Sequence, residues 1–138
     1  MADCVSALFA AVGPWRRPAM FAEPLRYMRK SAFWLALLAL ITLSLMPTKA
    51  LPAPIFQLWD KAQHALGFAS LMLLGLWAYP TQTHRLVPGL LLLGIGIELT
   101  QASTGWRQGD GLDLLANTVG MMLAWLIVRW WRGQRQTQ

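Results

Sequence analysis

Side chains that can handle protons or hold a charged ligand fall into three short blocks of this sequence. The first is Asp60-Lys61-Ala62-Gln63-His64, in which a carboxylate and an imidazole four residues apart share one face of a helix. Such a pair can bind a charged group or exchange protons with it. The alternative is that Asp60 only caps the helix, where the dipole favours an acid, and that the histidine lies at a membrane interface.

The second block places Glu98 and Gln101 three residues apart near the end of an apolar stretch. A carboxylate inside an apolar membrane segment is costly, and it is by default a hypothesis for a functional site. A desolvated carboxyl group and a histidine can both exchange protons near neutral pH. We therefore predict that Glu98 and His64 form a proton-handling pair, with a structural partnership between Glu98 and Arg107 as the alternative.

The third block extends from Arg107 to Asn117. Asp110 can cap a helix at this point, and Asp113 and Asn117 lie four residues apart, so that they line one helix face. The planar guanidinium of Arg107 can hold a carboxylate or a phosphate at two points. A network of salt bridges without a ligand is the alternative for this block.

The three blocks together supply the candidate site residues. The candidates for catalysis or for orienting a ligand are Glu98, His64 and Asp113, and the candidates for binding it are Asp60, Lys61, Gln101, Arg107, Asp110 and Asn117. We predict no metal site, because one histidine with no cysteine nearby argues against zinc; Mg²⁺ held by the carboxylates with a phosphate is chemically allowed but unsupported. No cofactor is expected, and covalent catalysis lacks a G-x-S-x-G motif. Whether the site is catalytic stays open.

Four apolar stretches must position these blocks, at about 31–46, 62–79, 86–102 and 112–131. A helix that crosses a bilayer needs about 20 mainly apolar residues. The stretches do not alternate as the strands of a membrane barrel do, and they lack the polar face of helices in a soluble bundle. We therefore expect an all-α membrane protein, a four-transmembrane-helix bundle with short loops. Residues 1–30 should form an irregular or interfacial tail, broken by Pro14, Pro18 and Pro24, and residues 132–138 a second tail.

The composition points the same way. Of 138 residues, 56% are hydrophobic and only 13% are charged, and the mean hydropathy is +0.41. A soluble domain usually carries about 25% charged residues. Disordered chains are poor in apolar residues, and the single cysteine excludes an internal disulfide. The length fits one domain.

The net charge of +6 could indicate a nucleic-acid partner, but the basic residues are distributed as in a membrane protein. Nine of the twelve flank the apolar stretches on one side: Arg16, Arg17, Arg26, Arg29, Lys30, Arg85, Arg129, Arg132 and Arg135. The positive-inside rule then places both termini in the cytoplasm. We expect a multi-pass protein of the bacterial cytoplasmic (inner) membrane, with the polar blocks at the outer face, the lipid bilayer as partner and no nucleic acid. The oligomeric state stays open.

The same blocks carry a resemblance to a known family. The sequence resembles the VanZ-like family of small bacterial integral membrane proteins, over about residues 60–124 and the preceding helix. The matching residues are Asp60-Lys61-Ala62-Gln63-His64 with Phe68 and Leu71, then Glu98-Leu99-Thr100-Gln101, and then Arg107, Asp110, Asp113, Asn117 and Gly120. The resemblance implies a membrane protein and, through one family member, a link to low-level resistance to the glycopeptide teicoplanin. It implies no biochemical mechanism.

Three functions remain in view. The first is a binding or enzymatic site at the outer face for a lipid head group, a lipid-linked wall precursor or a wall fragment. The second is a non-catalytic structural or interaction protein, in which the polar residues only hold the helices together. Small residues that would allow close helix contacts are Gly67, Gly75, Gly94, Gly96 and Gly120. A transporter is the third, disfavoured because four spans without a repeat are too few for a pathway.

Overall fold

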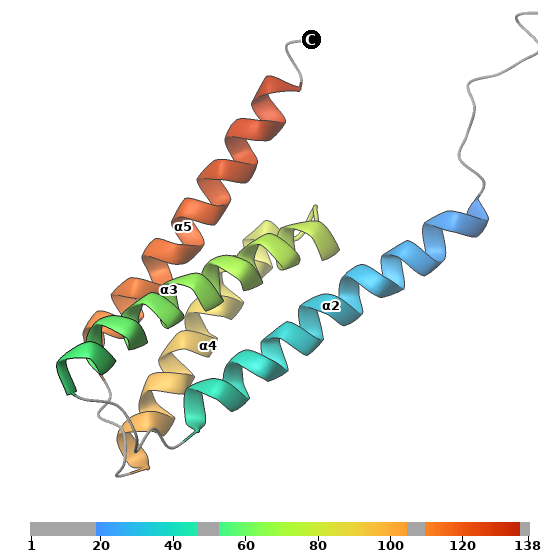
Figure 1. Ribbon diagram of the computed structural model, residues 1–138. Helices are drawn as coiled ribbons and strands as arrows, with labels where there is room; N and C mark the ends of the chain where they lie inside the picture. Colours follow the sequence, from blue (N-terminus) through green and yellow to red (C-terminus); the bar gives the residue numbers. More distant parts are fainter. Residues whose placement is uncertain (1–18, 47–52, 105–109, 136–138) are drawn as a thin grey trace, which may run out of the picture.

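The computed structural model describes residues 19–46, 53–104 and 110–135, with side chains from residues 23, 60 and 110 onward in these three ranges. The described chain is all-helical (Figure 1). Its helices are α2 (Ala19–Leu45), α3 (Ala53–Ala78), α4 (Thr83–Ser103) and α5 (Gly111–Gln134). The expectation of an all-α fold with four helices is confirmed.

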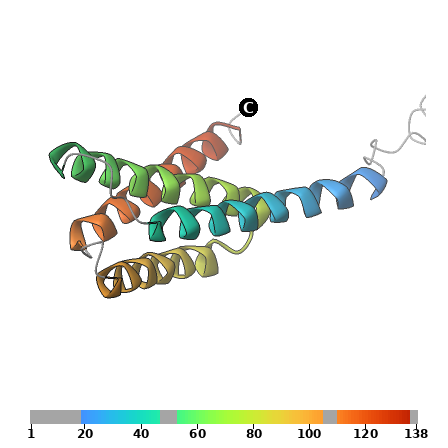
Figure 2. The same cartoon turned by 60° about the horizontal axis from the view of Figure 1, so that its bottom comes forward.

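The helices run up and down in turn, and α3 is the central one (Figures 1 and 2). It packs against α2, α4 and α5, and its contact with α5 is the most extensive of the fold. Within the described ranges α2 and α5 do not touch each other. Because successive helices run in opposite directions, the end of α2, the start of α3, the end of α4 and the start of α5 lie at the same end of the bundle (Figure 1).

The helix ends differ from the expected ones. The prediction that Pro24 breaks the chain into an irregular tail is wrong from Ala19 onward, because α2 passes through this proline. Pro88 likewise lies inside α4, which begins at Thr83. Both prolines lie early in their helices. A proline removes one backbone N–H and crowds one carbonyl, and at these positions only the first turns of the helix are disturbed. The helix Thr83–Ser103 is therefore longer than the apolar stretch from which it was predicted.

The core is a stripe along α3. Phe68, Leu71, Met72 and Leu76 are each at most 2% exposed, and their spacing of three and four residues places them on one helix face. Apolar side chains on the other helices also cover the outside of the molecule, and Leu35 of α2 is 66% exposed. Among the described residues, three helical segments are long and apolar enough to cross a membrane: Glu23–Leu45, Thr83–Ser103 and Gly111–Gln134.

Glycines allow the helices to approach closely at four of the five expected positions. A side chain at Gly120 would collide with the backbone carbonyl of Ala65, so α3 and α5 touch there main chain to main chain. The other three meet neighbouring side chains: Gly67 meets Leu40, Gly75 meets Leu86, and Gly94 meets Asn117, Leu114 and Phe68. The expectation for Gly96 is wrong within the described part of the chain, where nothing lies within 4 Å of a Cβ placed at this position.

Candidate functional site

The predicted polar residues come together at the end of the bundle where α3 and α5 begin and α4 finishes. We call this group the polar cluster; its described members are Asp60, Lys61, His64, Glu98, Gln101, Asp110, Asp113 and Asn117. Arg107, the remaining predicted member, lies outside the described residues. The helices are antiparallel and the segments between them are short, so residues that are far apart in the sequence lie at the same end of the bundle.

Lys61 of α3 is held between two carboxylates at the start of α5. Its Nζ lies 2.6 Å from Asp110 Oδ2 and 2.9 Å from Asp113 Oδ1. The Asp113 side chain is only 4% exposed, whereas that of Asp110 is 42% exposed. The hydrogen bond from Lys61, helped by one from the Leu112 backbone N–H, lowers the pKa of Asp110. Because the pKa of Asp110 is lower in the folded state, its ionised carboxylate stabilises the fold at pH values above the ordinary carboxyl pKa. This stabilisation is lost as the pH falls below that ordinary pKa.

His64 and Asn117 form the buried centre of the polar cluster. They are 4% and 0% exposed, and His64 Nδ1 lies 3.1 Å from Asn117 Oδ1. With the amide in this orientation, Nδ1 carries a proton and donates it in a hydrogen bond to Asn117 Oδ1. Asn117 Nδ2 has no hydrogen-bond partner among the described residues. The amide therefore fixes the ring of His64, as a residue that orients a base would.

Glu98 of α4 reaches the beginning of α5. Its Oε2 accepts a hydrogen bond of 3.0 Å from the Asp110 backbone N–H. Its Oε1 is buried and has no hydrogen-bond partner in the described part of the chain. No hydrogen bond joins Glu98 to His64 there either, so the two predicted proton-handling groups share the polar cluster without direct contact. A buried carboxylate oxygen without a partner is costly.

Gln101 takes a different place from the one expected for a ligand-binding residue. It is 1% exposed, and its Nε2 donates a hydrogen bond of 2.7 Å to the Ser44 backbone carbonyl in the last turn of α2. This carbonyl was missed by the sequence analysis. The sequence indicates this carbonyl only through its position in the last turn of a helix. The last four carbonyls of any helix lack an intrahelical donor, and a nearby amide can supply one.

A cavity of about 310 Å³ opens beside Glu98 and Asp110. Its remaining lining is apolar and includes Ile95 and Leu99 of α4 and Leu114 of α5. The carboxylates therefore stand next to a hydrocarbon wall. A cavity with a few polar groups on an apolar lining is the usual form of a small-molecule site, and this one suits an amphipathic ligand.

Three members of the polar cluster could together hold a divalent cation. Ligand atoms of Asp60, His64 and Asp113 lie within 4.8 Å of one another, and carboxylates with one imidazole are suitable ligands. However, the Lys61 ammonium already lies 2.9 Å from Asp113. A metal ion would have to compete with this ammonium for Asp113, because Lys61 already supplies a positive charge there.

Comparison with protein-family models, with curated proteins and with solved structures gives no match to this chain. The site is therefore interpreted from its own geometry.

Proposed function

We propose that the chain is an integral membrane protein with four spans, whose polar cluster binds the polar head group of a cell-envelope component. The three long apolar helices support the membrane assignment. The fourth span would be α3, which packs against all three of the others. A helix enclosed by spanning helices can carry Asp60, Lys61 and His64, because polar side chains at membrane depth are tolerated where they face the bundle interior.

The orientation follows from charge. The polar cluster would face the outside of the bacterial cytoplasmic membrane, and the opposite end, with Arg29, Lys30 and Arg85, would face the cytoplasm together with both termini. Trp130 and Trp131, at the same end on α5, are 63% and 58% exposed, as suits side chains that anchor a helix at the membrane interface.

The observation that carries the proposal is one carboxylate oxygen of Glu98, Oε1, which has no hydrogen-bond partner among the described residues. It is buried, it lacks a hydrogen-bond donor in the described chain, and its residue lines a cavity with apolar walls. A purely structural carboxylate at this depth would be expected to have both oxygens satisfied. A ligand that donates to Glu98 Oε1 from this cavity would remove the deficit.

The charges of the polar cluster indicate what the ligand carries. Its described members include four carboxylates and one ammonium, that of Lys61. An amine or another donor on the ligand would complement the surplus of carboxylates, while Arg107, three residues before Asp110 in the sequence, would bind a phosphate. A head group with both an amine and a phosphate, attached to a lipid, fits these requirements and the apolar wall.

The resemblance to the VanZ-like family supports an envelope ligand and extends the proposal to low-level glycopeptide resistance. If the ligand is also turned over, Glu98 and His64 would exchange protons with it, with Asn117 orienting His64 and Asp113 orienting the ligand. Binding is the core of the proposal, and turnover is not required for it.

The test is native mass spectrometry of the protein purified gently from its own membranes. Wild type should carry a bound species of defined mass, which Glu98→Gln and Arg107→Gln should each lose. Glu23→Gln and Arg129→Gln make the same chemical changes at the opposite end of the bundle and should retain it. A species that persists in the two cluster variants, or disappears equally in the two control variants, would contradict the proposal.

A structural role for the polar cluster is favoured by a separate observation. Lys61 and His64 tie α3 to α5, Glu98 ties α4 to the start of α5, and Gln101 ties α4 to α2. In that case Glu98→Gln should lower thermal stability without changing the bound species. Normal stability with loss of the bound species would favour the binding site.

A further inference from the structure

The end of the bundle opposite the polar cluster is strongly basic. Its described basic residues are Arg26, Arg29, Lys30, Arg85, Arg129, Arg132 and Arg135. Among the described residues only one acid, Glu23, lies at this end, and it is 3.7 Å from Arg26. The surplus of positive charge is therefore available to an external anion.

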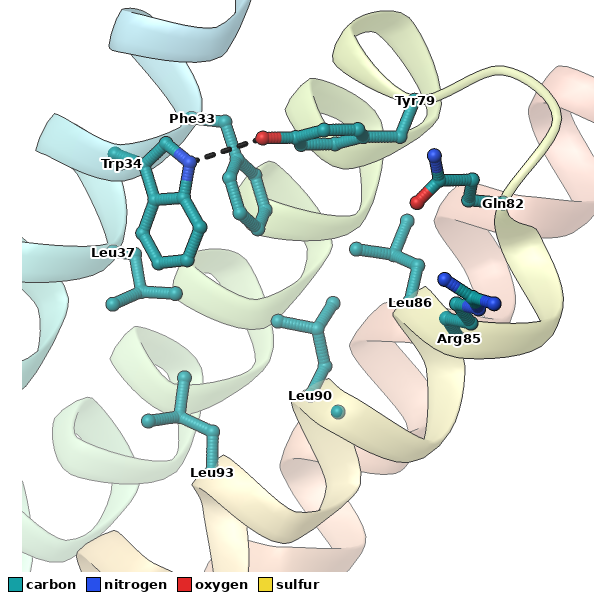
Figure 3. Close-up of a pocket in the computed structure, with 10 residues that line it drawn as sticks. Phe33, Trp34, Leu37, Tyr79, Gln82, Arg85, Leu86, Leu90 and Leu93 are labelled. Carbon is teal, nitrogen blue, oxygen red and sulfur yellow. Dashed lines mark hydrogen bonds between the residues drawn. The ribbon is translucent and has the colours of Figure 1, made fainter.

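An apolar groove of about 410 Å³ opens between α2 and α4 at this end (Figure 3). Phe33, Trp34 and Leu37 of α2 form one wall, and Leu90 and Leu93 of α4 form the other. We call it the α2/α4 groove. Because both helices are apolar enough to cross a membrane, hydrocarbon chains are the natural occupants of its lower part.

Polar groups lie only at the mouth of the α2/α4 groove, where Tyr79, Gln82 and Arg85 surround its upper end (Figure 3). The Trp34 indole N–H donates a hydrogen bond of 3.0 Å to the Tyr79 hydroxyl and joins the two sides. The Gln82 side chain makes no capping hydrogen bond to α4. Arg85 makes no ion pair with any acid in the described part of the chain. Lys30 adds a second cation, 5.7 Å from the centre of the Tyr79 ring.

These groups match the parts of one anionic phospholipid. The guanidinium and the amide can hold a phosphodiester, and the N-terminus of α4 beside them adds the positive end of a helix dipole. From Arg85 to Leu93 the wall measures about 12 Å at 1.5 Å per residue. This is close to half of the roughly 30 Å hydrocarbon core of a bilayer, so the groove has the depth of one leaflet.

We infer that the α2/α4 groove is a specific site for a phospholipid with a negatively charged head group, in the leaflet at the basic end. Arg85 and Gln82 hold the phosphate, and an acyl chain lies along the leucines of α4. This site is separate from the polar cluster: it rests on the proposed membrane assignment but not on the ligand proposed for the polar cluster. Charge complementarity distinguishes it from the remaining lipid-covered surface. The phosphate of a zwitterionic lipid can also reach Arg85, but its ammonium group is repelled by the basic residues at this end, so a head group with a net negative charge is favoured.

One glycine offers a way to close the groove without disturbing the fold. Gly89 lines it, and no atom of the described residues lies within 4 Å of a Cβ placed there. A leucine at this position would occupy the space of the acyl chain and meet no protein atom at its Cβ. Gly96, on the same helix, is equally open but does not line the groove. Gly96→Leu is therefore the matched control.

The experiment measures the binding of the first lipid to the purified full chain by native mass spectrometry. The two probes are phosphatidylglycerol and phosphatidylcholine with identical acyl chains. Wild type should bind phosphatidylglycerol at least about fivefold more tightly, the gain expected from one basic residue beside an anionic lipid. Arg85→Gln should reduce this preference, whereas Arg129→Gln, with the same charge change on α5, should keep it.

Gly89→Leu should weaken the first binding step for both lipids, while Gly96→Leu should bind both as wild type does. Arg85 is exposed, so its replacement tests the site even where the leucine variant is poorly folded. Equal affinity for the two lipids in wild type would overturn the proposal. So would a preference unchanged in Arg85→Gln, or an equal loss in Gly89→Leu and Gly96→Leu.

Discussion

Lys61 neutralises two carboxylates at once, and one of them, Asp113, is almost completely buried. Replacing the lysine with methionine would leave that charge without a partner. Breaking a buried pair in this way costs about 3–5 kcal/mol, and we expect about 3 kcal/mol because Lys61 is 30% exposed. The unfolding of purified Lys61→Met in mixed micelles, followed by tryptophan fluorescence, would measure this loss.

Lys30→Met is the control for that variant, because its ammonium lies at the basic end over the Tyr79 ring and should contribute about 1 kcal/mol or less. Adding Asp113→Leu to Lys61→Met should recover part of the lost stability, since the stranded charge is then gone. Equal stability of the two single variants would show that the ion pair does not stabilise the fold.

At the scale of single residues, the sequence predicted which residues belong to the polar cluster. It did not predict which of them bind one another. Spacing of three or four residues placed Asp60 with His64 and Asp113 with Asn117 on common faces, because helix geometry alone fixes that. Which side chains meet across helices depends on rotation and depth, which spacing does not contain. Thus the tie between Gln101 and the Ser44 carbonyl could not be predicted.

Between elements, the closest approach is that of α3 and α5 at Gly120. Gly120→Ala would push its Cβ into the Ala65 carbonyl, and a backbone cannot turn aside as a flexible side chain can. We expect a loss of about 1–3 kcal/mol, as for other overpacked contacts, measured by the same unfolding assay. Gly96→Ala, which adds the same methyl group on an open face of α4, should lose nothing. Similar losses in both variants would show that the contact with Ala65 does not set the cost, since alanine has a higher helix propensity than glycine at both positions.

The four helices were predictable from hydropathy, because the apolar stretches show neither the alternation of membrane strands nor the polar face of helices in a soluble bundle. The residues at which these helices begin could not be predicted in the same way. Hydropathy marks where a helix enters an apolar environment, whereas hydrogen bonding decides where it begins, so α2 starts at Ala19 and α3 at Ala53, ahead of their most apolar parts. The start of α5 was better defined, because Asp110 caps it in extended backbone with φ −120° and ψ 119°.

For the whole molecule, the proposed topology places the turn between α3 and α4 inside the cell and the end of α4 outside. In a Cys4→Ser background, Ser103→Cys should react with an impermeant thiol reagent added to intact cells, and Thr81→Cys should react only after the membrane is opened. Both positions are exposed, so access to the thiol depends on the membrane alone. The reverse labelling pattern would overturn the orientation, and labelling of both in intact cells would show that α4 does not cross.

The central position of α3 also affects the order in which the protein can be built. The ribosome releases α3 before α5, so the carboxylate and amide that satisfy Lys61 and His64 do not yet exist when α3 reaches the membrane. Polar side chains without partners are unfavourable in hydrocarbon. In the proposed topology the second span would therefore stay at the translocation channel or the bilayer surface until the last span arrives. The last helix to be synthesised would then hold in the membrane a helix that was synthesised before it.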